Sequence, residues 1–442
     1  MTKELMTIVG PGDALPDEGR AVLLVDDQIY PARDFEKVAE SITLGSGVEE
    51  VEGGYRLTKS CADRVMGFEK LAGHVMFFAS DDTHVNTFLR IAPYCAQHTM
   101  VVHGTIDFGA RAALKKNGQV YEVHGRNMKA FQTANIALIG NDNGKEEHVF
   151  IHHCHRFGIP VVSLQEAVNM DFEGPPYRMR WADRSFLGGV HALRYHERVL
   201  SVITGNPRYD DICPEPLPND PYVLINCNFT FGVAHDWSRA WLEQTIEAAR
   251  RADLDYRITV HPRDETDLTG IENVLDSNAF VVHEQIAGCY VLVSRDSSVP
   301  YEALLMNRHA LYYNPFDEQE RCLNEDDTGL IHKANTVDDL STTLKKLRDE
   351  PLPQDHQGGL AETFQTYFTG IDGSNAKRVA RALQVMLDGE YFGRPDAMRD
   401  AYAITWTRMF TQNVLRPKLR QIGWARALWK FMKYRVFRFP HE

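Results

Sequence analysis

Short apolar runs alternate with longer amphipathic segments along most of the chain. A continuous apolar run of about four to eight residues is typical of a strand buried in a parallel sheet, and apolar positions three and four residues apart predict a helix. A first series of runs predicts strands near Ala21–Val25, His74–Ala79, Met100–His103, Ile136–Gly140, Pro160–Leu164 and Val199–Thr204. A second series predicts strands near Tyr222–Asn226, Tyr256–Val260, Phe280–Val282, Tyr290–Val293 and Ala310–Tyr313. Between them, helices are predicted at Thr83–Tyr94, Glu146–Phe157, Asp236–Ala252, Val299–Met306 and Val337–Leu347. Such alternation is typical of an α/β fold with parallel sheets.

The two series are separated by the segment Asp210–Pro221, DDICPEPLPNDP, in which four prolines and four acidic residues interrupt any regular pattern. A chain of 442 residues also exceeds what one compact core usually holds. We therefore predict two Rossmann-like domains facing across a cleft, residues 1–210 and 211–385, followed by a helical basic tail over residues 386–442. In this architecture ligands bind beyond the carboxyl ends of the strands.

The net charge is distributed unevenly. The 442-residue chain carries a formal charge of −13, but the part from Ala403 onward has nine basic residues and one acidic residue, a charge of +8. The remainder, with 39 basic and 60 acidic residues, has a charge of −21. An acidic body would repel a phosphate backbone, so nucleic acid is not expected as a partner.

Other features of composition concern the compartment. No stretch reaches the ~18 uninterrupted apolar residues of a membrane span, and the N-terminal sequence MTKELMTIVGPGD lacks a basic start and an apolar signal core. Seven widely spaced cysteines without a CxxC pair indicate reduced thiols rather than disulfides or a zinc site. We expect a cytoplasmic protein.

Two strand ends in the second domain offer groups that bind anions. After the run Val291–Val293, Ser297 and Ser298 stand where a strand gives way to a helix, so their hydroxyls and the first backbone N–H groups can face a phosphate. The alternative is that one of these serines only caps the helix. The segment ITVHPRDE ends another strand with His261, Pro262 and Arg263; a guanidinium fits a phosphate, and an imidazole can donate a hydrogen bond without a permanent charge.

These motifs carry a family resemblance. The second half of the chain resembles the donor-binding domain of a GT-B glycosyltransferase, and the serine pair followed by Tyr-Glu-Ala-Leu is similar to the pattern of that class. In bacterial sialyltransferases and Kdo transferases a His-Pro motif and a serine pair hold the nucleotide phosphate of a CMP-sugar. The resemblance thus implies that His261, Pro262, Ser297 and Ser298 bind the donor phosphate and that Glu302 holds the donor.

The segment between the domains adds to the resemblance. VITGNPRYDDICPE, from Val202 to Glu215, and the preceding Trp181-Ala182-Asp183 resemble surface-carbohydrate biosynthesis proteins and the glycerophosphotransferases that build wall polymers. The resemblance covers about residues 160–315, whereas the first 150 residues match no pattern and are expected to bind a variable acceptor. Arg208 in the GNPR turn either reaches the donor or stabilises the hinge.

A transferase needs a base for the acceptor hydroxyl, or a nucleophile if configuration is retained. Glu166, in SLQEAVNMD after a first-domain strand, is our candidate catalytic carboxylate; the alternative is a capping or surface residue. Retaining Kdo transferases place an aspartate nucleophile where this chain has LINCNFTFG, with Asn226 and Asn228. Asn228 is a candidate catalytic side chain because an amide can orient a sugar or water, but it cannot be the covalent carrier. Retention and inversion both stay open.

Other motifs carry less weight. His152, His153 and His155 lack a carboxylate at ligand spacing, so no metal and no other cofactor is predicted. Asp26-Asp27 follow the first strand and either bind a cation or cap a loop, and Asp81-Asp82 are expected to cap a helix. The absence of GxGxxG after the first strand, and of GxxxxGK[ST] anywhere, argues against dinucleotide oxidoreductases and P-loop kinases.

The basic tail can form a helix after Pro417 with one apolar and one cationic face. Lys, Arg and Trp together are typical of a helix lying on an anionic membrane, where each basic residue adds about 1 kcal/mol of attraction. The alternative is that this helix packs on the first domain. The residues predicted to face a membrane are Trp424, Arg426, Trp429, Lys430 and Lys433.

Together these features predict a GT-B glycosyltransferase, with a nucleotide-sugar as donor and a glycan or lipid-linked glycan as acceptor. The resemblance implies a CMP-activated ulosonic acid such as Kdo, used in bacterial surface polysaccharide or lipopolysaccharide synthesis at the inner face of the cytoplasmic membrane. A CDP-glycerol-type glycerophosphotransferase and a non-hydrolysing nucleotide-sugar epimerase are alternatives. A non-catalytic scaffold that binds nucleotide-sugars is a further alternative from another class.

Overall fold

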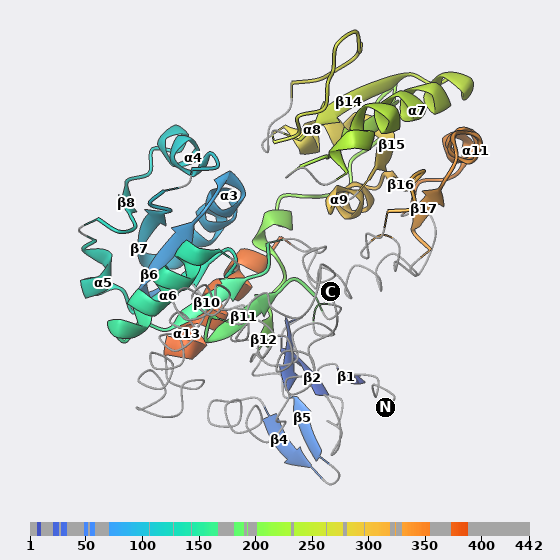
Figure 1. Cartoon of the computed structure of the whole chain (residues 1–442). Helices are drawn as coiled ribbons and strands as arrows, with labels where there is room; N and C mark the ends of the chain where they lie inside the picture. Colours follow the sequence, from blue (N-terminus) through green and yellow to red (C-terminus); the bar gives the residue numbers. More distant parts are fainter. Residues whose placement is uncertain are drawn as a thin grey trace, which may run out of the picture.

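The computed structural model describes residues 70–387, with gaps at 106, 127, 143, 167–180, 190–191, 193–200, 231–233, 262, 277–280, 296, 319–322, 324–328 and 354–372, and five short strands before residue 58. Figure 1 shows two lobes that each contain one larger sheet. Among the described residues, no helix combines the length and the apolar composition that a bilayer crossing demands.

Seven parallel strands form the sheet of the first domain, in the order β12-β11-β10-β9-β6-β7-β8. They are β6 (Leu71–Ala79), β7 (Cys95–Val102), β8 (Tyr121–Val123), β9 (Ile136–Ile139), β10 (Val161–Leu164), β11 (Arg184–Leu187) and β12 (Ser201–Ile203). The helices are α3 (Asp82–Ile91), the 3₁₀ turn η1 (Ala92–Tyr94), α4 (Ala110–Lys116), α5 (Ala130–Thr133) and α6 (Lys145–Arg156).

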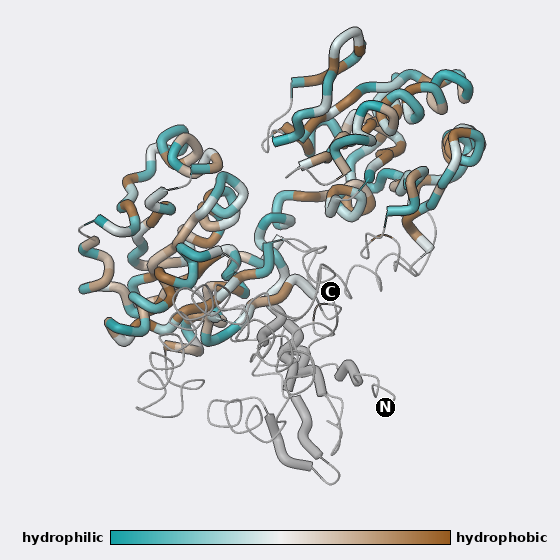
Figure 2. The backbone as a smooth tube through the Cα atoms, viewed as in Figure 1, coloured by the Kyte–Doolittle hydropathy of each residue, from teal (hydrophilic) through white to brown (hydrophobic). Residues whose placement is uncertain are grey.

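The central strand β6 explains why helices cover both faces of this sheet. Successive side chains of a strand point to opposite faces. Val75 and Phe77 therefore pack with α3 and α4 on one side, while Met76 and Phe78 pack with α6 on the other. Both sets are fully buried, which accounts for the continuous apolar run in the sequence, and Figure 2 shows these strands as an apolar interior.

The second domain contains five parallel strands in the order β14-β13-β15-β16-β17. They are β13 (Tyr222–Cys227), β14 (Tyr256–Val260), β15 (Cys289–Ser294), β16 (His309–Tyr313) and β17 (Ile331–Ala334). Helices α7 (Ser238–Arg251) and α11 (Val337–Asp349) pack on one face, and α8 (Val282–Ala287) and α9 (Val299–Leu305) pack on the other. The 3₁₀ turn η5 (His235–Trp237) precedes α7.

The α/β fold with parallel sheets is confirmed, and two details of the sequence prediction are wrong. In the described part of the strand expected near Phe280–Val282, Val281 is the N-cap and Val282 the first residue of helix α8, and Ile286, one turn later, is buried against the sheet. The strand Ala21–Val25 (β2) is present, but it pairs with β1 (Thr7–Val9) and, antiparallel, with β3 (Gln28–Ala32) in a separate sheet. Strands β4 (Val48–Val51) and β5 (Gly54–Leu57) form a hairpin.

The chain crosses back to the first domain after the second. Helix α13 (Asn375–Leu387) buries Val379 and Leu383 in the core of the first domain (Figure 1). Its first turn is held by Asp210, whose carboxylate accepts the backbone N–H groups of Asn375 and Ala376 at 2.9 and 2.7 Å. The boundary at residue 385 stays a prediction, but α13, which it assigns to the second domain, packs against the first. Apart from Met386 and Leu387, which end α13, the predicted basic tail lies outside the described residues.

Candidate active site

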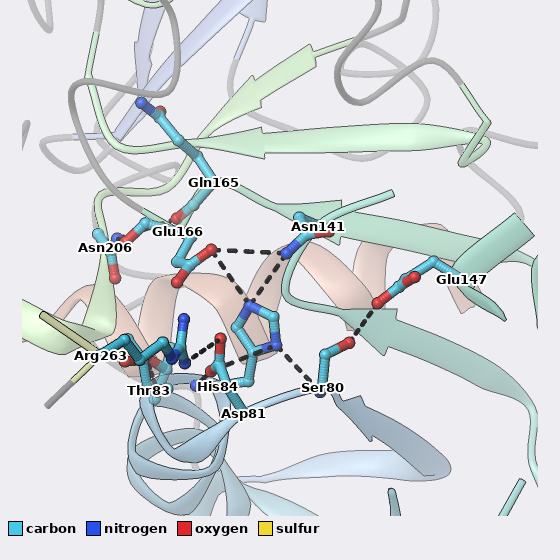
Figure 3. A network of polar contacts seen from close by, with 11 residues as sticks. Ser80, Asp81, Thr83, His84, Asn141, Glu147, Gln165, Glu166, Asn206 and Arg263 are labelled. Atoms are coloured by element: carbon cyan, nitrogen blue, oxygen red, sulfur yellow. Dashed lines mark hydrogen bonds and ion pairs between the residues drawn. The ribbon is translucent and has the colours of Figure 1, made fainter. Parts of the chain in front are cut away.

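The loops at the carboxyl ends of the two sheets bring polar side chains together. Ser80 and Asp81 follow β6, Asn141 follows β9, and Glu166 follows β10. From the second domain, Arg263 extends from the end of β14 into the same cluster, as Figure 3 shows. The predicted position of the site at the strand ends therefore agrees with the geometry.

Asp81 begins this cluster as the N-cap of helix α3. Its carboxylate accepts the backbone N–H of His84 at 2.9 Å, which confirms the predicted capping role. Capping fixes the first turn of α3 and thereby the direction of the His84 side chain, which is only 3% exposed.

His84 and Asn141 hold Glu166 in one orientation (Figure 3). The Nε2 atom of His84 lies 3.5 Å from the Oε2 atom of Glu166, and Asn141 donates to the same oxygen at 3.5 Å. Because a carboxylate can only accept hydrogen bonds, Nε2 is the nitrogen that directs a proton toward Glu166. The Glu166 side chain is 25% exposed, whereas that of His84 is 3% exposed. Glu166 can therefore meet a substrate, and His84 supports it from behind.

The charges of this pair stabilise one another. Burial alone would lower the pKa of His84, but Asp81 and Glu166 raise it to about 9. Burial alone would raise the pKa of Glu166, but His84, followed by Arg208 and Arg263, lowers it to about 2. Glu166 is thus ionised at neutral pH, as a group that accepts a hydroxyl proton must be.

The pair predicts a characteristic dependence of stability on pH. The contribution of Glu166 is complete above its ordinary pKa of 4.5 and is lost as the pH falls toward 2; that of His84 is complete below 6.5 and is lost as the pH rises through about 9. We expect Glu166→Gln to lower the melting temperature most between about pH 4.5 and 6.5. Thermal unfolding from pH 2 to 10 measures this, with Glu243→Gln on α7 as the surface control. A difference that does not vary with pH contradicts it.

Gly140, directly after β9, makes room for the His84 ring. A Cβ atom at this position would lie 2.1 Å from Cδ2 of His84, so the ring has to move. We expect Gly140→Ala to reduce both activity and stability, the latter by about 1–3 kcal/mol as in other overpacked cores. Chemical denaturation of Gly140→Ala in the wild-type and His84→Ala backgrounds checks this, because removal of the ring should abolish the effect of the methyl group. An equal loss in both backgrounds contradicts the assignment.

Arg263 connects the two domains. Its guanidinium lies 3.7 Å from the carboxylate of Asp81 and stacks on the ring of Phe108, 4.6 Å from the centroid, and both partners belong to the first domain. Its backbone N–H donates to Nδ1 of His261 at 3.1 Å, which leaves Nε2 as the N–H donor of that ring. Burial and the charge of Arg263 lower the pKa of His261 to about 4, so the ring is neutral at pH 7.

The segment between the domains contains the 3₁₀ turn η4 (Pro207–Tyr209) and contacts both domains. The amide of Asn206 donates to the backbone carbonyl of Glu166 at 3.0 Å, and Arg208 forms an ion pair with Glu302 of α9 at 2.9 Å. Glu302 is fully buried and also accepts from Nε2 of His283 at 2.7 Å. Of the two roles considered for Arg208, the hinge contact is the one observed.

The serine pair and Asn228 surround the carboxyl end of β15. The Oγ atom of Ser297 accepts the backbone N–H of Val299 at 3.2 Å, the local capping contact named as the alternative. Ser298 is the N-cap residue of α9 and makes no side-chain capping bond. Arg295 donates to the carbonyl of Asn228 at 2.9 Å and forms a two-pronged ion pair with Glu318, so these two strand ends are held together. Roles for these residues in binding or catalysis stay predictions.

His261 and the serine pair lie at the same edge of the second sheet but not on adjacent strands. His261 follows β14 and Ser297 follows β15, and β13 lies between them. Two strand spacings of about 4.8 Å therefore separate such positions along the sheet. Pro262 lies outside the described residues, as do the five predicted membrane-facing residues of the tail.

The histidines near the end of α6 have local partners. His155 contacts Asp183 at 2.8 Å, and Nδ1 of His153 lies 3.2 Å from Nε2 of His124. His84, Asn141 and His283 were not predicted from the sequence, because no motif marks them and the elements that carry them are far apart along the chain.

Asp81, His84 and Glu166 are the one group in the described part of the chain whose candidate ligand atoms all lie within 4.8 Å of one another. A metal there would displace the Nε2 proton of His84 and compete with the guanidinium of Arg263. We therefore expect activity to be unchanged after EDTA treatment and after addition of Mg²⁺ or Mn²⁺. A loss on chelation that Mn²⁺ restores contradicts this prediction.

The architecture has counterparts among solved structures. A protein assigned as a UDP-N-acetylglucosamine 2-epimerase from Listeria monocytogenes matches with 13% identity over 72% of this chain and 97% of its own, with a TM-score of 0.51. The wall teichoic acid polymerase TagF matches with 15% identity over 71% and 89% of the two chains and a TM-score of 0.48. The glycotransferase of kitacinnamycin matches with 11% identity over 72% and 99% and a TM-score of 0.46. Protein-family models and curated proteins gave no match.

At these identities the similarity concerns the fold. Two Rossmann-like domains, joined by a structured turn and followed by a helix that returns to the first domain, define the GT-B architecture. This chain has that architecture, with its polar cluster at the carboxyl ends of the strands.

Proposed function

We propose that the chain is a GT-B glycosyltransferase that moves a sugar from a nucleotide-activated donor to an acceptor hydroxyl. One observation carries the proposal: Glu166 of the first domain, ionised and oriented by His84, shares a polar cluster with the anion-binding strand end of the second domain through Arg263 and Asp81. Transfer to an acceptor requires a base on one side and stabilisation of the departing phosphate on the other.

The donor is held by the second domain. His261 is neutral and has Nε2–H available as a donor, and Arg263 adds a positive charge at the same strand end. Ser297 and Ser298 offer hydroxyls at the other strand end, and Glu302 supports the donor. Pro262 is included in the donor site because the His-Pro motif resembles that of CMP-sugar transferases. The resemblance of the His-Pro and Ser-Ser motifs to CMP-sugar transferases supports a CMP-activated ulosonic acid such as Kdo as the donor.

Glu166 acts on the acceptor hydroxyl as a base. A carboxylate with a pKa of about 2 is a weak base, but Arg208 and Arg263 are among the groups that lower it. A donor phosphate near these guanidinium groups offsets their charge and raises the proton affinity of Glu166. Deprotonation of the acceptor thereby becomes favourable when the donor is bound. Asn228, which has no acidic group, orients the sugar or water.

The acceptor is a glycan or lipid-linked glycan of a bacterial surface polysaccharide. The composition of the tail supports a position at the inner face of the cytoplasmic membrane, because Trp424, Arg426, Trp429, Lys430 and Lys433 fit an anionic lipid surface. Glycerophosphate transfer from a CDP-activated donor uses the same phosphate-binding groups and the same base. It is the second candidate because the observed cluster serves both reactions.

A nucleotide panel tests the proposal. Thermal shifts with CMP, CDP, UDP and GDP should show stabilisation by the cytidine nucleotides. Both candidate reactions release CMP, so stabilisation by CMP but not by CDP favours an ulosonic acid donor, and stronger stabilisation by CDP favours glycerophosphate transfer. Stabilisation by UDP alone overturns the cytidine assignment and brings the epimerase alternative forward. If no nucleotide stabilises the protein, the transferase proposal itself fails.

A further inference from the structure

Glu302 lies in the middle of a buried ionic cluster on the donor side. It is 0% exposed, and its two oxygens are bound separately by Arg208 at 2.9 Å and by His283 at 2.7 Å. Burial alone would raise the pKa of Glu302, but these two partners lower it to about 2. A carboxylate in this position does not contact a donor directly, and its effect on a ligand passes through its partners.

His283 is the partner that reaches the surface. Its side chain is 29% exposed, and it stands in the first turn of α8 beside Glu302 of α9. A carboxylate can only accept hydrogen bonds, so Nε2 of His283 must carry the proton that Glu302 binds. In the neutral ring, Nδ1 is then a hydrogen-bond acceptor whose direction is fixed by the Glu302 contact.

Arg208 connects this cluster to the candidate active site. Its charge acts on Glu302 in the second domain and also on Glu166 and Asp81 in the first. The guanidinium of Arg208 is therefore close to Glu302 of the second domain and to Glu166 and Asp81 of the first. In the proposed function, this is the border where a donor bound to the second domain faces the acceptor. His283 is thus a donor-side residue close to the reacting region.

We propose that His283 binds a hydroxyl group of the donor through Nδ1, and that Glu302 is a positioning residue that acts through His283. This inference rests on the proposed function and adds a donor contact to it. A hydroxyl fits because it can donate a proton to an acceptor nitrogen. A phosphate oxygen at neutral pH is itself an acceptor and fits the cations and N–H groups of His261 and Arg263 instead.

The donor carries hydroxyls in two places, the ribose and the transferred group, and three ligands distinguish them. Titration calorimetry compares CMP with 2′-deoxy-CMP, which differ in one ribose hydroxyl, and CMP with CMP-sialic acid, which differ in the transferred group. In the wild-type protein we expect one of the two comparisons to show about 3- to 10-fold tighter binding of the ligand with the additional hydroxyl, the contribution of one hydrogen bond. In His283→Ala the affected ratio should fall to about one.

Two further variants separate contact from general damage. Glu302→Gln should reduce the same ratio, because an amide no longer fixes the His283 ring in the same way. His235→Ala, an exposed histidine in η5 at the same edge of the sheet, should leave it unchanged. Thermal unfolding of each variant reports whether it folds. If Glu302→Gln does not fold, the His283→Ala variant alone tests the inference.

The outcomes are distinct. Loss of the ribose ratio assigns His283 to the ribose, and loss of the CMP-sialic acid ratio assigns it to the transferred group. If both ratios persist in His283→Ala, or if that variant weakens all three ligands equally, the inference is overturned and the proposed function stands. If the wild-type protein binds CMP but shows neither ratio, the inference is overturned as well. If it binds none of the three ligands, the CMP-donor proposal fails and the inference falls with it.

Discussion

Replacing Glu166 with Gln is expected to lower the turnover number by about 100- to 10 000-fold, the usual contribution of a positioned general base. The amide preserves the size of the side chain but cannot accept the acceptor proton. The donor dissociation constant should not increase, because the donor-binding groups belong to the second domain and the amide removes a negative charge near the donor phosphate. Initial rates of sugar transfer, together with calorimetric titration of the donor nucleotide, measure the two quantities separately.

The matched control is Glu243→Gln, which removes an equivalent charge from the surface of α7. His84→Gln should show a smaller loss than Glu166→Gln, because it only misorients the carboxylate. If Glu166→Gln turns over at the wild-type rate, Glu166 is not the base. A non-catalytic scaffold would keep its full binding function in this variant and would show no sugar transfer in the wild-type protein, so the rate measurement decides between an enzyme and a scaffold.

The position of the site was predictable because parallel sheets collect their functional loops at one edge. Glu166, His261 and Ser297 each follow an apolar run directly, and a strand end can be located from such a run without knowing the neighbouring strands. The same reasoning identified Asp81 as a capping residue, since capping depends on a few neighbouring positions only.

The supporting residues were not predictable in this way. His84 lies 82 positions before Glu166 in the sequence. Its ring fits beside β9 only because Gly140 has no side chain. The contacts of His84 with Glu166 and of His283 with Glu302 depend on which elements become neighbours in space, and the local sequence pattern does not contain that information. The ion pair between Arg263 and Asp81 also depends on how the two domains are packed against each other.

The error at Phe280–Val282 has a similar origin. Two adjacent valines favour a strand by intrinsic preference, but Val282 lies in the connection between the parallel strands β14 and β15, where helix α8 buries Ile286 against the sheet. The tertiary requirement for a crossover between parallel strands outweighs a weak local preference. Because α8 is a helix, His283 is placed beside α9, where it meets Glu302.

Replacing Arg263 with Met is expected to weaken donor nucleotide binding by about 10- to 100-fold, the loss of a charge-assisted hydrogen bond to a phosphate. The wild-type guanidinium is 29% exposed and is positioned by the Phe108 ring beneath it, so little ordering is needed for it to meet an anion. The nucleotide affinity of Arg263→Lys should lie between those of the wild-type protein and Arg263→Met, since lysine keeps the charge but lacks the planar guanidinium group. Titration of the nucleotide at two salt concentrations should show a weaker salt dependence for Arg263→Met.

Arg257 provides the matched control for this change. It lies within β14, the strand that precedes Arg263, and it is exposed and stacks on the Tyr222 ring at 4.3 Å. Arg257→Met removes an equal charge from the same part of the domain and should leave nucleotide affinity unchanged. Equal losses in both variants would mean that the net charge of the domain, and not a built phosphate site, attracts the nucleotide. Wild-type affinity in Arg263→Met would remove Arg263 from the donor site and leave its ion pair with Asp81 as a contact between domains.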